Sequence, residues 1–235
     1  MGISRRDFFY GTAASTALVL STSGAKANTC VMPTQERQAA LTPQGVVDEL
    51  MAGNQRFVSG NMVNCDLNAQ VLQTSEGQYP IAAVVGCIDS RVPPEMVFDQ
   101  HIGDIFSARV AGNFVNTDIL GSLEFACRVA GSKAIVVLGH SSCGAVKGAI
   151  DQVELGNLTA MLERIEPAIE AAGPTDMRSS SNTEFVQRVA DANVSLTVDA
   201  IMEQSEVLAG MVEAGELVIV GAMHDVATGQ ISLIG

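Results

Sequence analysis

Four short apolar runs, separated by long segments, constrain the fold of this 235-residue chain more than any other feature. They cover residues 81–86, 105–109, 134–139 and 217–223. Continuous apolar runs are typical of parallel strands buried on both faces, and the intervening segments are long enough for crossover helices. A short run at residues 231–234 predicts a closing strand. We therefore expect an α/β fold with a central, mainly parallel β-sheet flanked by helices.

Three further segments are expected to be helical. Residues 43–59 carry apolar side chains near helical spacing, and a second helix is predicted over residues 145–153. Residues 173–182 are rich in Ser, Pro and Gly and predict an exposed turn. A longer helix is expected after this turn, from about residue 183 to residue 214.

Metal-binding residue types follow two of the predicted strands. Cys87, Asp89 and Arg91 follow the first run, and His140 and Cys143 follow the third. Open α/β sheets bind ligands at the carboxyl ends of their strands. Two thiolates and an imidazole suit zinc better than magnesium or calcium, and three protein ligands leave the open position of a catalytic site. We predict one Zn²⁺ per chain on Cys87, His140 and Cys143. The alternative is that the two cysteines are inert buried thiols, but the charged residues Asp89 and Arg91 nearby make this less favourable.

Asp89 and Arg91 are the expected catalytic pair. Arg91 can hold the carboxylate with two hydrogen bonds and keep it ionised, so that Asp89 accepts a hydrogen bond from zinc-bound water. Zinc lowers the pKa of that water from about 15.7 toward about 7. A purely structural ion pair is the alternative interpretation.

The two groups read C-x-D-x-R and H-x-x-C, in that order, and the chain therefore resembles the β class of carbonic anhydrases over roughly residues 41–235. The resemblance implies reversible hydration of carbon dioxide to bicarbonate and a proton. It also implies a central parallel sheet, an N-terminal helical arm and an intimate homodimer, which can assemble into a higher homo-oligomer.

The resemblance extends to residues that would contact substrate. Gln78 precedes the first motif, where plant-like members have a glutamine that reaches across the dimer interface to substrate oxygen. Phe106 and Phe125 correspond to the apolar CO₂ pocket, although plant members have tyrosine at the position of Phe125. The backbone N–H of Gly144 could donate to substrate, and Arg109 is expected near the dimer interface.

Five other cysteines and histidines lie outside the predicted site. Cys127 lies in an apolar helical stretch and is expected to be buried. Cys30 and Cys65 either form a disulfide in an oxidising compartment, or they remain free thiols or form bonds to another molecule. His224 stands where relatives usually have tyrosine, and we expect a structural role. His101 is expected at the surface, with proton shuttling as the alternative role.

Residues 1–27 have the pattern of a twin-arginine export signal. Arg5 and Arg6 precede a mildly apolar run, residues 10–20, and the segment ends in an A-x-A cleavage pattern. The run is too short to serve as a permanent membrane anchor. We expect export to the periplasm and one catalytic domain, residues 28–235; a frayed cytosolic N-terminus is the alternative.

Charge excludes two classes of partner. The formal net charge is −13, and removal of the leader would leave 10 basic and 25 acidic residues. Such a surface repels phosphate backbones and anionic lipids, so neither nucleic acid nor a membrane surface is an expected partner.

Two other functions remain open from the sequence. A relative of the same fold could hydrolyse CS₂ or COS, and it would differ in the access to its pocket and in its assembly. A zinc-stabilised binding protein without turnover is the second alternative. The Asp89–Arg91 pair argues against it, because a structural site needs no poised carboxylate.

Overall fold

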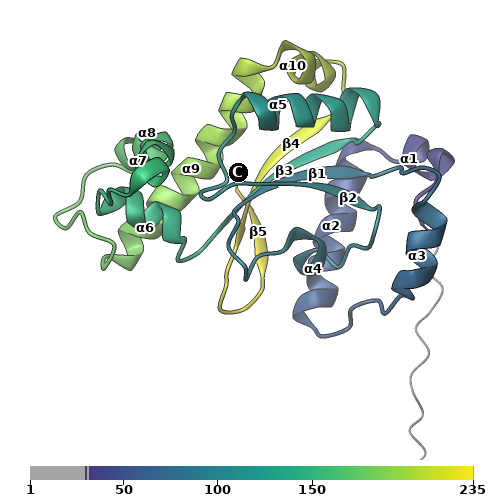
Figure 1. Cartoon of the computed structure of the whole chain (residues 1–235), viewed down its shortest axis with the longest axis horizontal. Helices are drawn as coiled ribbons and strands as arrows, with labels where there is room; N and C mark the ends of the chain where they lie inside the picture. The colour runs from purple at the N-terminus through teal and green to yellow at the C-terminus, as the bar shows by residue number, and fades with distance from the viewer. Residues whose placement is uncertain (1–29, 31, 235) are drawn as a thin grey trace, which may run out of the picture.

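A five-stranded sheet of order β2-β1-β3-β4-β5 forms the centre of the computed structural model, which describes residue 30 and residues 32–234 (Figure 1). Its strands are β1 (Ala82–Gly86), β2 (Ile105–Arg109), β3 (Ala134–His140), β4 (Val218–His224) and β5 (Ile231–Ile234). The pairs from β2 to β4 are parallel, and β5 is antiparallel to β4. The predicted α/β fold with a mainly parallel sheet is confirmed, and each predicted strand ends within about a residue of the observed one.

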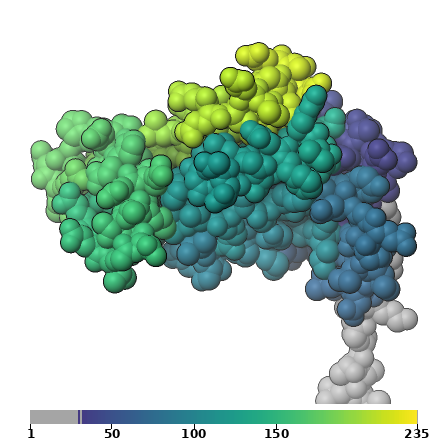
Figure 2. Space-filling view, turned by 45° about the horizontal axis from the view of Figure 1, so that its top comes forward, coloured from purple at the N-terminus to yellow at the C-terminus, as the bar shows by residue number. Residues whose placement is uncertain are grey.

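Helices cover both faces of this sheet. One face carries α2 (Pro43–Val58) and α4 (Pro94–Val97); the other carries α5 (Thr117–Glu124), its π-helical continuation η1 (Phe125–Val129), α9 (Thr183–Gln204) and α10 (Glu206–Glu213) (Figure 1). The N-terminal part adds α1 (Gln35–Ala40) and α3 (Leu67–Thr74), and α1 with α2 forms the predicted helical arm. A lobe at one end of the molecule holds α6 (Gly144–Ile150), α7 (Gly156–Leu162), the 3₁₀ turn η2 (Glu163–Ile165) and α8 (Glu166–Ala171), drawn in green in Figure 2.

Burial on both faces explains why the central strands β1 and β3 are almost wholly apolar. In β1, Ala83 and Val85 pack into the core beneath α5 and α9, whereas Ala82 and Val84 pack into the core beneath α2. Successive side chains of a strand point to opposite faces, so a strand between two helical layers needs an apolar residue at every position.

Local signals set the helix ends. The Thr42 hydroxyl accepts a hydrogen bond from the Gly45 N–H at 3.1 Å, and Pro43 occupies the first turn of α2, where its missing N–H costs nothing. The predicted helix over residues 145–153 is shorter in the structure, because α6 ends at Ile150 and Gln152 has a positive φ of 52°.

The prediction of a single helix over residues 183–214 is wrong. Ser205 is extended, with φ −125° and ψ 99°, and separates α9 from α10. Its hydroxyl accepts from the Leu208 N–H at 3.2 Å and lies 2.6 Å from the Glu124 carboxylate, to which it donates. The cap and the hydrogen bond to Glu124 together end the helix here, although the spacing of apolar residues continues through this position.

A disulfide between Cys30 and Cys65 ties the N-terminal segment to the loop between α2 and α3. Of the alternatives left open by the sequence, the structure has the intramolecular bond. The predicted export leader lies outside the described residues. In the described part of the chain, no helix has the length and apolar character needed to cross a membrane.

Candidate metal centre and active site

Neighbouring strands bring the two metal-binding motifs together. β1 and β3 pair in parallel, with Gly86 opposite Leu138, so the loops that follow them leave the same edge of the sheet. The ligand atoms of Cys87, His140 and Cys143 all lie within 4.8 Å of one another, and the two sulfur atoms are 4.0 Å apart. All three residues are buried. The proximity that the sequence only implied is confirmed.

A tight turn aims His140 and Cys143 at one point. Ser142, between them, has a positive φ of 54°, a conformation that is costly for a residue other than glycine. Cys143 then stands at the N-terminus of α6, which begins at Gly144. The strain at Ser142 is the cost of reversing the chain within one turn, between a strand end and a helix start.

The free atoms of this cluster fit a zinc ion. His140 Nδ1 lies 3.0 Å from the Ser141 carbonyl oxygen and must donate to it, which leaves the Nε2 lone pair available. Among the described residues, the buried Nε2 has no hydrogen-bond partner, a costly state that a metal ion would relieve. Two thiolates on one tetrahedral zinc lie about 3.8 Å apart, close to the separation of the Cys87 and Cys143 sulfurs.

A hydrogen bond joins the two thiols, and either sulfur can be its donor. This bond lowers the pKa of Cys87 to about 4, although burial opposes the shift. The same bond, with burial, raises the pKa of Cys143. A cation that binds both sulfurs as thiolates would displace the protons that they carry, so binding should weaken as the pH falls.

Asp89 is held beside the cluster by Arg91. The guanidinium donates through Nε and Nη2 to the two carboxylate oxygens at 2.9 and 2.8 Å, and the Arg91 backbone N–H donates at 3.0 Å. These bonds hold the pKa of Asp89 well below its usual range. One carboxylate oxygen lies 3.9 Å from His140 Nε2, so Asp89 is an ionised acceptor at the edge of the site.

Three supporting residues were not assigned this role from the sequence. Arg109 donates to the carbonyl oxygens of Cys87 at 2.8 Å and Asp89 at 2.7 Å, and so fixes the loop that carries both. The Gly112 N–H donates to the Cys87 sulfur at 3.4 Å, and Asn193 of α9 donates to the Gly112 carbonyl at 2.8 Å. The sequence signal that could have indicated Asn193 is a polar residue on the apolar face of a predicted helix.

The residues predicted to contact substrate are only partly brought together. Phe106 and Phe125 meet edge to face, with centroids 6.2 Å apart, and line a cavity of about 710 Å³ between β2 and α5. Gln78 is exposed in the loop before β1 and lines a different hollow, near α1. Gly144 is exposed in the first turn of α6. Their contact with substrate remains a prediction.

His224 is buried at the end of β4, opposite His140 in the strand register. Neither ring nitrogen has a hydrogen-bond partner among the described residues, and burial, with His140 as the next cause, lowers its pKa. A neutral imidazole is therefore the favoured form. The predicted burial of Cys127 is confirmed, since it is 2% exposed within η1.

Comparison with known proteins places the chain in one family. The sequence model described as carbonic anhydrase matches residues 82–231. Carbonic anhydrase 2 of Mycobacterium tuberculosis is 37% identical over 190 residues, which are 77% of this chain and 87% of that protein.

Two solved structures agree in fold. The β-carbonic anhydrase CafA of Aspergillus fumigatus has a TM-score of 0.62 and 26% identity, covering 80% of this chain and 90% of that one. A tetrameric β-carbonic anhydrase of Sordaria macrospora has a TM-score of 0.61 and 26% identity, covering 72% of this chain and 90% of that one. With its motifs joined in one cluster on this sheet, the chain belongs to the β-class carbonic anhydrase family.

Proposed function

We propose that this protein catalyses the zinc-dependent, reversible hydration of carbon dioxide to bicarbonate and a proton, with one zinc per chain on Cys87, His140 and Cys143. The observation that carries the proposal is the buried Nε2 of His140, which has no hydrogen-bond partner in the described part of the chain and lies within 4.8 Å of both thiols and 3.9 Å from an ionised carboxylate. A structural site would have no use for that carboxylate.

When bound, zinc supplies Lewis-acid chemistry that makes water nucleophilic near neutral pH. The chain's own residues would orient that water. Asp89, kept ionised by Arg91, would accept a hydrogen bond from it and so favour the orientation in which it can attack CO₂. Arg109 holds the Cys87–Asp89 loop by its carbonyl oxygens, which keeps the carboxylate and the thiolate at a fixed separation.

Substrate is assigned to the side of the sheet where Phe106 and Phe125 meet. Carbon dioxide is apolar, and aromatic walls bind it while excluding water. The Gly144 N–H, which lies in the first turn of a helix and so has no intrahelical acceptor, can donate to a substrate oxygen. Gln78 would supply a second donor from the partner subunit.

Assembly into a homodimer or larger homo-oligomer is part of the proposal. Within the described residues, β2 is an edge strand. Phe125 is 51% exposed and Val129 is 72% exposed on the helix beside it. Apolar groups next to an open strand edge favour burial against a second copy. The tetrameric Sordaria relative supports such assembly.

The proposal also includes export of the protein. Arg5 and Arg6 in the twin-arginine pattern, together with the Cys30–Cys65 disulfide, support a periplasmic location after removal of residues 1–27. We propose neither a stable membrane anchor nor a nucleic-acid partner.

A matched pair of cysteine variants tests the activity. Cys143→Ser and Cys127→Ser replace thiols that are 1% and 2% exposed, so the cost of burying a hydroxyl is similar. We expect Cys143→Ser to lose zinc and CO₂ hydration in a stopped-flow assay, and Cys127→Ser to retain both. Equal activity of the two variants would contradict the site. Turnover of COS or CS₂ without CO₂ hydration by the wild type would assign the alternative hydrolase function.

A further inference from the structure

A second cluster of two sulfur atoms and an imidazole lies away from the active site. The ligand atoms of Cys30, Cys65 and His101 are all within 4.8 Å of one another. Cys30 precedes α1, Cys65 lies before α3, and His101 lies in the loop before β2, so three separate segments converge here. The donor types match those of the active-site cluster. In this structure the two sulfurs are joined as a disulfide.

The imidazole of His101 is already held in the way metal-binding histidines are held. Nδ1 lies 3.3 Å from Asp104 Oδ2, and the same oxygen accepts the His101 backbone N–H at 2.8 Å. A carboxylate behind the ring fixes its orientation and leaves the other nitrogen for a metal. Nε2 lies 3.1 Å from the Val63 carbonyl oxygen, which can only accept, so this nitrogen would give up that hydrogen bond and its proton to bind a metal. The His101 side chain is 18% exposed, less than the predicted surface position implied.

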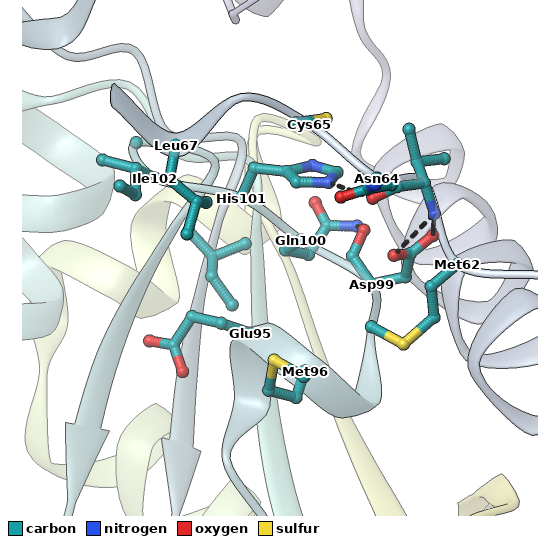
Figure 3. Close-up of a pocket in the computed structure, with 13 residues that line it drawn as sticks. Met62, Asn64, Cys65, Leu67, Glu95, Met96, Asp99, Gln100, His101 and Ile102 are labelled. Atoms are coloured by element: carbon teal, nitrogen blue, oxygen red, sulfur yellow. Dashed lines mark hydrogen bonds between the residues drawn. The ribbon is translucent and has the colours of Figure 1, made fainter. Parts of the chain in front are cut away.

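An adjoining cavity gives an ion access to the cluster. Cys65 and His101 line a hollow of about 570 Å³, and Figure 3 shows the His101 ring beside Cys65 at its edge. Asp99 lies in the same cavity wall, but its carboxylate is bound by Arg56 Nε at 2.6 Å and faces the Val63 N–H. A fourth ligand would therefore be solvent from the cavity.

We propose that the reduced chain binds a second zinc ion through Cys30, Cys65 and His101, and that formation of the disulfide expels it. A dithiol reductant gives up two electrons and two protons: its own sulfurs join, the Cys30–Cys65 bond breaks, and two cysteine thiols form. Zinc then binds both sulfurs and releases the two thiol protons to solvent. In the reverse direction, disulfide exchange with an oxidised dithiol joins the sulfurs and frees the ion.

The sulfur atoms need little movement for this change. They would separate from about 2 Å in a disulfide to about 3.8 Å on a shared zinc, which rotation about the side-chain bonds can supply. Two thiolates with an imidazole favour zinc over the hard, oxygen-binding cations. In the oxidised state the disulfide would tie the N-terminal segment to the loop between α2 and α3. In the reduced state the zinc ion would tie the same two segments together.

Zinc counting on the whole protein tests the proposal. Wild-type protein and the variants His101→Ala, Cys143→Ser and Cys127→Ser are equilibrated with a zinc buffer, either oxidised or reduced with a phosphine, and zinc is measured by mass spectrometry. Cobalt replaces zinc in a parallel series, so that thiolate-to-cobalt absorption reports the sulfur ligands directly. His101→Ala leaves the disulfide cysteines in place, and Cys127→Ser controls for loss of an unrelated thiol.

We expect about two zinc ions per reduced wild-type chain and about one per oxidised chain. Reduced His101→Ala should hold about one, whereas reduced Cys127→Ser should hold about two. Cys143→Ser should hold about one only when reduced, which separates this site from the active site. Equal zinc content in the two redox states of the wild type would overturn the proposal, as would an unchanged count in reduced His101→Ala.

Discussion

Removing the Cys30–Cys65 disulfide should cost a large part of the stability of this protein. The perturbation is the double variant Cys30→Ser/Cys65→Ser, which can form neither this cross-link nor the proposed second zinc site. The bond closes a loop with a sequence separation of 35 residues. In the chain-entropy treatment, a closed loop of about 35 residues contributes about 3.8 kcal/mol at 25 °C by restricting the unfolded chain. For a domain of this size, the melting temperature should fall by about 8–15 °C.

The assay is urea unfolding followed by circular dichroism, at one fixed protein concentration because association adds to apparent stability. Cys127→Ser serves as the control, since it also places a hydroxyl at a buried cysteine position but breaks no cross-link. The double variant should lose about 3–4 kcal/mol more than this control. A difference below about 1 kcal/mol would refute the reasoning, because the cross-link would then not restrict the unfolded chain as this treatment requires.

Four further changes have defined outcomes. Asp89→Asn should retain zinc but lose about 10²–10⁴-fold in CO₂ hydration; near-normal rates would remove the carboxylate from the mechanism. Arg91→Ala should free that carboxylate to occupy the metal's open position, with inhibition strongest at low pH; a pH–rate profile parallel to the wild type would argue against this. Gly112 has a φ of +86°, and a Cβ added there would lie 2.7 Å from Ile165 Cδ1, so Gly112→Ala should lower the free energy of unfolding in urea by about 1–3 kcal/mol; wild-type stability would show that the backbone adapts. Replacing Arg5 and Arg6 by lysine should leave active precursor in the cytoplasm, as cell fractionation would show; efficient export would contradict the twin-arginine assignment.

The strands and the metal-binding cluster were predictable because their signals are local or topological. A strand buried on both faces is almost wholly apolar, and this signal located β1 and β3 within about a residue. The strands β2 and β4 are only partly buried, but their apolar residues located them as closely. Cys87 and His140 each follow such a strand. These two residues meet only if their strands are neighbours in the sheet. Hydrophobic periodicity does not give the strand order, so the prediction that they meet came from the resemblance to a known family.

The supporting contacts were not predictable because they join segments far apart in the sequence. Ser205 interrupts a helical pattern because its hydroxyl reaches Glu124, which lies 81 residues earlier. Asn193 and Gly112 are also separated by 81 residues. The Cys30–Cys65 bond depends on how the N-terminal segment packs beside α3, and composition carries no information about that packing.

Zinc X-ray absorption of the oxidised wild-type protein tests the central claim most directly, because it counts the ligands of the active-site ion while the Cys30–Cys65 pair is closed. The account predicts two sulfur ligands at about 2.3 Å and two nitrogen or oxygen ligands at about 2.0–2.1 Å, one of them from solvent. Cys143→Ser should lose the sulfur signal together with the metal. A shell of three or four sulfurs, or a wild-type protein that hydrates CO₂ with no sulfur-bound zinc, would contradict the account.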